Sequence, residues 1–124
     1  MLSLQIKPHT INNLQIAEVI SDETLIQTPQ DGLDLLGNVY YQGFDRMIVY
    51  EKNLTPDFFD LKNGLAGEIL QKFSNYRIRL ALVGDFSAYT GKSITDFMYE
   101  SNNGKQVNFL KTVEEALEKL ARND

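Results

Sequence analysis

Two short apolar stretches constrain the fold of this chain more than any other feature. Residues 47–50 form an unbroken apolar run, and residues 78–83 are apolar except for Arg79; both are too short for buried helices, and stretches of this kind are typical of strands covered on both faces. A helix-type segment precedes each run. Because a strand–helix–strand unit forces parallel pairing with a right-handed crossover, these runs predict a mainly parallel sheet with helices packed on it.

The N-terminal segment predicts a hairpin at one side of that sheet. Apolar and polar residues alternate over residues 2–6, which indicates a half-buried strand, and a second apolar stretch covers 14–20. Residues 10–13 supply turn chemistry, since asparagine tolerates left-handed backbone. The predicted fold class is therefore α/β, a mixed sheet of order β-β-α-β-α-β-α-β-α with an antiparallel N-terminal hairpin, and its last strand covers 107–110.

Four helices are expected from their start and stop signals. The first helix is expected to start at Thr28-Pro29-Gln30-Asp31 and to end at Gly43, and the second carries the ladder of Leu61, Leu65, Ile69 and Phe73. The third is expected to be capped by Ser93 and broken at Asn102-Asn103-Gly104, and the fourth to start at the Thr112 capping box.

A chain of 124 residues matches one hydrophobic core, so residues 1–124 are expected to form a single domain. The core residues follow from the period of each element, and they are Leu4, Ile16, Leu36, Ile48, Val49, Leu65, Ile69, Leu80, Leu82, Phe109 and Leu117.

Composition excludes several classes of function. The chain has no cysteine, which rules out disulfides, zinc–thiolate sites and thiol nucleophiles. Its net charge of −5 and scattered basic residues act against nucleic-acid binding. The N-terminus alternates instead of running apolar, and no stretch approaches the roughly 20 apolar residues of a membrane span. We therefore expect a cytoplasmic protein with no cofactor, no nucleic acid and no membrane contact.

The element order and several segments resemble known families. A hairpin followed by alternating helices and strands, with RLALVGD at 79–85 and VEEA at 113–116, resembles the sulfate-transporter and anti-sigma-antagonist (STAS) fold. More closely, the chain resembles a family of small bacterial proteins of unknown function. The segments that carry this resemblance are GNVYYQG at 37–43, LTPDFFDL at 54–61, GLAGE at 64–68, KFSNYR at 72–77 and VGDF at 83–86.

One departure from the STAS pattern concerns regulation. Anti-sigma antagonists of this fold carry a phosphorylatable serine just before the helix that follows the third strand. The matching residues 57–64 contain no serine or threonine, and Thr55 suits a capping role ahead of Pro56. The sequence therefore does not support a phosphorylation switch on that helix.

The best candidate for a functional surface is the pair of loops that follow the third and fourth strands. In open α/β sheets, clefts form at the carboxyl ends of parallel strands, and the connection 53–64 is long for a strand-to-helix loop. Aspartates there suit acid–base work or metal binding, yet they also suit helix starts. The candidate ligand- or partner-binding residues are Asp57, Phe58, Phe59, Asp60, Lys62, Asp85, Ser87 and Lys92.

These residues favour a non-enzymatic regulatory or protein-interaction module. The alternative is a small-ligand-binding protein or a cryptic enzyme that uses the cleft at the carboxyl ends of strands three and four, with Asp57, Asp60 and Asp85 converging there. The sequence assigns no catalytic residue and no metal ligand, and it leaves open a protein partner, a small ligand and a homodimer. His9, the single histidine, is expected to be solvated at the hairpin tip.

The loop from Gly84 to Ser93 ends in Gly-Lys-Ser and superficially resembles a phosphate-binding loop. The Walker spacing requires glycine five residues before Gly91, and Phe86 stands there instead. Asp85 would also repel phosphate groups.

We therefore predict that the protein neither hydrolyses nor tightly binds ATP. Calorimetric titration with Mg-ATP should give no saturable heat, because the backbone cradle for the phosphates lacks its first glycine. Micromolar binding that disappears in Lys92→Ala would contradict this prediction.

Overall fold

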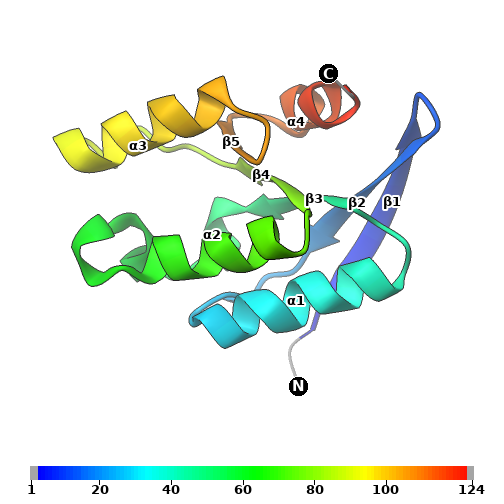
Figure 1. The fold of residues 1–124 in the computed structure, drawn as a ribbon, viewed down its shortest axis with the longest axis horizontal. Coiled ribbons are helices and arrows are strands. Elements are labelled where there is room, and N and C mark those ends of the chain that lie inside the picture. The colour runs from blue at the N-terminus through cyan, green and yellow to red at the C-terminus, as the bar shows by residue number, and fades with distance from the viewer. Residues whose placement is uncertain (1–2, 123–124) are drawn as a thin grey trace.

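The computed structural model describes residues 3–122, and this part of the chain forms one mixed sheet with four helices packed on it (Figure 1). The strand order is β1-β2-β3-β4-β5, antiparallel between β1 and β2 and parallel thereafter. The predicted fold class and element order are confirmed. The strands are β1 (Gln5–Ile11), β2 (Leu14–Ile20), β3 (Arg46–Tyr50), β4 (Arg79–Val83) and β5 (Val107–Leu110).

The N-terminal hairpin is longer than its sequence predicts. The turn consists of Asn12 and Asn13 alone, both with positive φ (54° and 66°). Two such residues give a turn whose twist matches that of the flanking strands, so pairing continues up to the turn. Thr10 and Ile11 therefore belong to β1 and not to the turn, while Leu2 lies outside the described residues.

The helices are α1 (Pro29–Tyr41), α2 (Leu65–Asn75), α3 (Lys92–Asn103) and α4 (Val113–Leu120). The predicted start of α1 is confirmed: the Thr28 side chain accepts a hydrogen bond from the Asp31 backbone N–H, and the Asp31 carboxylate accepts one from the Thr28 backbone N–H. Gly43, with φ of 95°, follows its end as predicted.

Two helix starts differ from the prediction. The Leu61 ladder does not begin α2, because Gly64 adopts a left-handed φ of 75° and separates Leu61 from the helix. The third helix begins earlier than a Ser93 cap requires. Its N-cap is Gly91, which has no side chain to accept the first amides.

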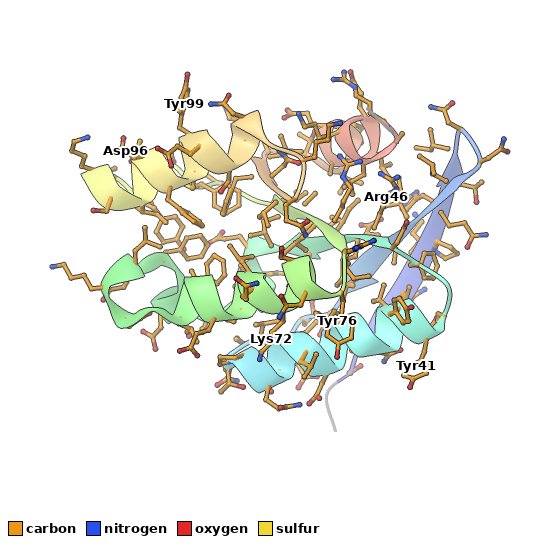
Figure 2. The ribbon with its side chains drawn as sticks, viewed as in Figure 1. Tyr41, Arg46, Lys72, Tyr76, Asp96 and Tyr99 are labelled. Carbon is orange, nitrogen blue, oxygen red and sulfur yellow. The ribbon has the colours of Figure 1, made fainter. Side chains whose placement is uncertain are left out.

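Helices cover both faces of the sheet, but unequally. The helices α1, α2 and α3 pack on one face against a large apolar cluster, and α4 alone covers the other face over Ile48 and Ala81 (Figure 1). Two strand-start arginines bind the C-terminal end of α4. Arg46 donates to the Leu120 carbonyl at 2.8 Å (Figure 2), and Arg79 donates to the Arg122 carbonyl at 2.6 Å. Cations at this end complement the helix dipole.

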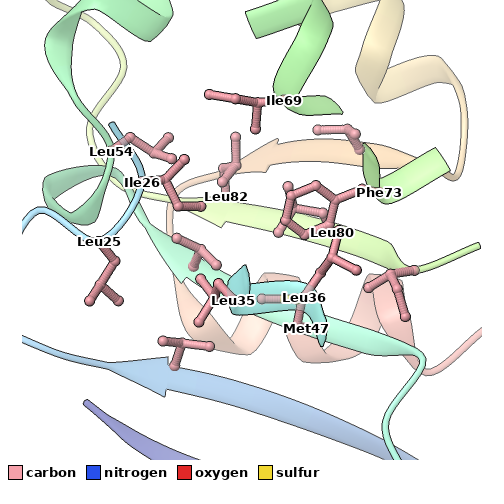
Figure 3. Packing of buried hydrophobic residues seen from close by; sticks show 14 of the residues in the cluster. Leu25, Ile26, Leu35, Leu36, Met47, Leu54, Ile69, Phe73, Leu80 and Leu82 are labelled. Carbon is pink, nitrogen blue, oxygen red and sulfur yellow. The ribbon is translucent and has the colours of Figure 1, made fainter. Parts of the chain in front are cut away.

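The core lies mainly between the sheet and α1–α3, where Leu36, Met47, Ile69, Phe73 and Leu80 interdigitate (Figure 3). Most of the predicted core residues are buried, namely Ile16, Leu36, Ile48, Val49, Ile69, Leu80, Leu82 and Phe109. The others, Leu4, Leu65 and Leu117, are half-buried and pack at the margins of the two clusters. Within residues 3–122, no helix has the length and apolar character needed to cross a membrane.

We predict that Ile48→Ala and Leu82→Ala each lower the free energy of unfolding by about 2–5 kcal/mol, because each leaves a cavity in a fully buried site on a different face of the sheet. Urea unfolding should measure this loss. Tyr41→Ala is the control, since Tyr41 is 91% exposed and its loss should change stability little (Figure 2). A loss below about 1 kcal/mol in both core variants would contradict the strand assignments.

Candidate functional site

The carboxyl ends of β3 and β4 lie side by side and carry the two loops that the sequence singles out. Parallel pairing sets Tyr50 opposite Val83, so the connections 51–64 and 84–91 leave the sheet together. The first connection is not an extended loop. It folds into three short 3₁₀ helices, η1 (Glu51–Asn53), η2 (Pro56–Phe59) and η3 (Leu61–Asn63), and the Thr55 side chain caps η2 as its position before Pro56 suggests.

One carboxylate joins the two connections. Glu51 accepts a hydrogen bond from the Tyr89 hydroxyl at 2.6 Å. A Cβ on Gly84 would lie 2.5 Å from the Glu51 Cβ, so only glycine leaves room for the glutamate there. Burial of the phenol, reinforced by the hydrogen bond to Glu51 and its negative charge, raises the pKa of Tyr89 to about 12.

An aromatic cluster lies beneath this hydrogen bond. The Tyr89 ring stacks on Phe59, with centroids 4.0 Å apart and planes 13° apart. Phe58 meets Phe59 edge-on at 5.1 Å, and Phe86 packs between Phe59 and Phe109. Because three aromatic rings, those of Phe58, Phe86 and Tyr89, pack against it, the Phe59 ring is held in place.

Beside Phe59 lies an open hollow of about 440 Å³ between η2–η3 and the start of α3. We call it the η3–α3 hollow. Its apolar lining comes from Phe59, Leu61 and Ile94, and its charged lining residues are Asp60, Lys62 and Lys92. The residues that line it are Phe59, Asp60, Leu61, Lys62, Gly91, Lys92, Ser93 and Ile94.

Four of the eight candidate residues from the sequence line this hollow. They are Phe59, Asp60, Lys62 and Lys92, contributed by the first connection and by the first turn of α3. The Asp60 carboxylate is used locally, because its Oδ1 accepts the Lys62 backbone N–H at 3.3 Å and so starts η3.

The other four candidate residues lie outside the hollow. Phe58 is fully buried and supports Phe59 from below. Asp57 is exposed in the first turn of η2. Asp85 accepts a hydrogen bond from the Ser87 backbone N–H at 3.0 Å; hydrogen bonds from the Ser87 side chain and backbone, followed by the Lys111 charge, lower the pKa of Asp85. Asp57, Asp60 and Asp85 thus do not share one pocket.

The two lysines of the hollow differ in their surroundings. Lys92 binds Asp96 one turn along α3 at 2.7 Å, on the solvent-facing side of the helix that also carries Tyr99 (Figure 2). Both members of this pair are well exposed, so it contributes little to stability. Lys62 is exposed and makes no ion pair within residues 3–122.

A second group of ionisable side chains lies on the face that α4 covers. The sequence predicts that His9 is solvated at the hairpin tip, and this prediction is wrong. His9 lies within β1, its side chain is 19% exposed, and its Nε2 lies 2.8 Å from Glu18 Oε1. The longer hairpin places it there. The Tyr50 hydroxyl donates to the other oxygen of Glu18. These partners bind a carboxylate that is almost buried in β2.

The pKa values of this group follow from its burial and its bonds. Burial raises the pKa of Glu18, but hydrogen bonds from Tyr50 and His9 and the charges of His9 and Lys7 outweigh it, so the pKa lies below its ordinary value. Burial, the hydrogen bond to Glu18 and the charges of Glu18 and Glu114 raise the pKa of Tyr50 to about 12. None of the main hollows in the described part of the chain is lined by this group.

Sequence reasoning missed the residues that shape the site. Gly84 directly after a strand and Tyr89 inside a polar loop were available signals, but only the parallel register shows that Glu51 meets both. Within the part of the chain that the structure describes, no group of three or more His, Asp or Glu side chains could hold a metal ion.

Comparison with known proteins adds a family but no activity. A family model described as "Domain of unknown function (DUF4180)" matches residues 11–120, which is most of the chain. No curated protein matches the chain.

We predict that Tyr50 and Tyr89 ionise late in an alkaline titration. Each has a native pKa of about 12 against an ordinary value of 10.0, so the folded state holds these protons more tightly than the unfolded chain does. The two tyrosines therefore stabilise the folded state fully below about pH 10, and this contribution to the free energy of unfolding is lost as the pH rises through about 12. Absorbance of tyrosinate at 295 nm should show a late phase that becomes smaller in Tyr89→Phe and in Tyr50→Phe, with circular dichroism as the control for unfolding. A late phase of unchanged size in both variants would contradict the two hydrogen bonds.

Proposed function

Because the chain belongs to the DUF4180 family, whose function is unknown, we propose from its own geometry that it is a non-enzymatic regulatory module which binds a protein partner through the η3–α3 hollow. The observation that carries this proposal is the hollow itself: an open, partly apolar depression with fixed walls and two lysines among its lining residues. Partner contacts in folds of this kind are usually placed on loops at the carboxyl ends of the strands.

The local roles of the carboxylates support binding over catalysis. A general acid–base pair needs two titratable groups that face one bound molecule. Here Asp60 starts η3 and Asp85 closes a turn with Ser87, and only Asp60 lines the hollow. The packed aromatic cluster, by contrast, holds the loops that line the hollow, and a preorganised surface loses little entropy when a partner covers it.

The resemblance to STAS proteins supports the regulatory part of the proposal. The sheet order, with an antiparallel hairpin followed by parallel strands, is compatible with a STAS-like fold in a small bacterial protein. Anti-sigma antagonists of that fold act by binding other proteins. Since residues 57–64 contain no serine or threonine, we propose that partner binding here does not depend on phosphorylation of that segment.

The test is a quantitative pull-down with matched charge reversals. Wild-type protein, Lys62→Glu/Lys92→Glu and the control Lys72→Glu/Lys105→Glu are immobilised, and captured proteins are quantified by mass spectrometry. Both double variants change the net charge equally, but Lys72 and Lys105 lie outside the hollow. We expect a partner that wild type and control retain and that the hollow variant loses. Lys62, Lys92 and Lys105 are exposed and Lys72 is half-buried, so thermal melting of all three proteins is measured to show that each one is folded. Equal capture by all three would refute the proposal.

A small-ligand-binding protein is the second candidate, and the volume of the hollow favours it. About 440 Å³ lies within the size range of small-molecule pockets. Saturation-transfer NMR with a panel of small carboxylates and phosphates would test it, using the same two double variants. Saturable binding that the Lys62→Glu/Lys92→Glu change removes would favour this candidate over a protein partner.

A further inference from the structure

The position of Lys92 in the η3–α3 hollow is not explained by local stability. Lys92 is the first residue of α3, where the positive end of the helix dipole disfavours a cation. Its pair with Asp96 has the lysine N-terminal to the acid, which is the weaker orientation of an i,i+4 pair on a helix. The carboxylate that lines the hollow, Asp60, binds a backbone amide.

The hollow therefore has an excess of positive charge beside an apolar surface. Lys62 and Lys92 line it against the single carboxylate of Asp60, and Gly91 offers no side-chain acceptor to the start of α3. Phe59 and Ile94 are almost completely buried and Leu61 is half-buried, so the apolar surface that they offer is small. An apolar side chain that enters the hollow would lie near both lysines.

The charge of the whole molecule limits what can approach. A net charge of −5 repels a strongly acidic partner at long range, so a polyacidic tail is disfavoured. A short motif with one or two carboxylates meets the local excess of cations without much long-range repulsion. Such isolated charges contribute more to specificity and register than to raw affinity.

We propose that the occupant of the hollow is a short segment of a partner protein with an Asp or Glu next to an apolar anchor residue. This inference rests on the proposed function, since it names the chemistry of the partner at the same site. The apolar anchor covers Phe59, Leu61 and Ile94, and the carboxylate binds Lys62 and Lys92, displacing the exposed Asp96 from Lys92.

A random peptide library displayed on phage tests the inference even though the partner is unidentified. Wild-type protein should enrich peptides that carry Asp or Glu within two residues of Leu, Ile or Phe. The Lys62→Glu/Lys92→Glu variant should lose that enrichment, and the Lys72→Glu/Lys105→Glu control should keep it. Enriched peptides without acidic residues, or acidic peptides that bind the hollow variant equally, would overturn the inference.

The best peptide is then synthesised with a fluorophore and measured by anisotropy. We expect the charge-reversed hollow variant to bind about tenfold more weakly or worse, and Lys62→Arg/Lys92→Arg to stay within about threefold of wild type, because the charge is retained. Affinity should fall as salt rises. If no peptide is enriched while the pull-down still loses its partner in Lys62→Glu/Lys92→Glu, the short acidic motif is rejected and the proposed function stands.

Discussion

The arrangement of the site depends on a steric constraint between Glu51 and Gly84, because the space beside these two residues can hold only one side chain. The register of β3 and β4 makes them neighbours, because each is the first residue after its strand. A Cβ at Gly84 would lie 2.5 Å from that of Glu51, well inside the contact distance of two carbon atoms. With glycine at one position, the glutamate occupies the space, and its carboxylate reaches the Tyr89 hydroxyl. The hydrogen bond thereby joins the start of the first connection to the later part of the second.

The consequence is a rigid wall next to a solvent-facing hollow. Tyr89, held by Glu51, stacks on Phe59, and Phe59 forms one side of the η3–α3 hollow. A second tie fixes the same connection from the other side: the Asn53 side chain donates to the carbonyls of Ser21 and Glu23, 2.9 and 2.7 Å away. These side-chain hydrogen bonds satisfy backbone carbonyls that, in a β-sheet, would be paired with a neighbouring strand. The long connection after β3 is therefore ordered without an α-helix or strand of its own.

The sequence predicts the elements of this fold far better than it predicts the site. Period and caps are local, so the Thr28 start of α1 and the buried strand at 47–50 are visible in a few adjacent residues. The break at Gly64 is also local, but an apolar ladder that runs through it hides it, since Leu61 keeps the helical spacing without belonging to α2. His9 is mispredicted for another reason: its partner Glu18 lies on the neighbouring strand, and its burial depends on how far the hairpin extends.

The candidate site shows the same division between local and non-local information. The sequence identifies Phe59, Asp60, Lys62 and Lys92 because all lie near strand ends, and it includes Asp57 and Asp85 for the same reason. What separates the two sets is the backbone course of the two connections, since η2 and η3 decide it for Asp57 and Asp60, and the turn of Asp85 with Ser87 decides it for Asp85. Glu51 and Tyr89 are 38 residues apart, and no periodic pattern connects them.

At the carboxyl edge of a parallel sheet, acidic and basic side chains differ in how strongly they indicate a binding site. Every helix that follows a parallel strand begins there, so aspartates and glutamates gather at this edge as caps and dipole partners, whatever the protein does. Asp31 and Asp60 have this role here, and their presence carries no information about chemistry. A lysine at the start of a helix has the opposite meaning, because the dipole opposes it. Lys92 is in that position, and Lys62 lines the same hollow. The acidic composition first draws attention to these loops, but the cations among the acids are the stronger indication of a binding surface.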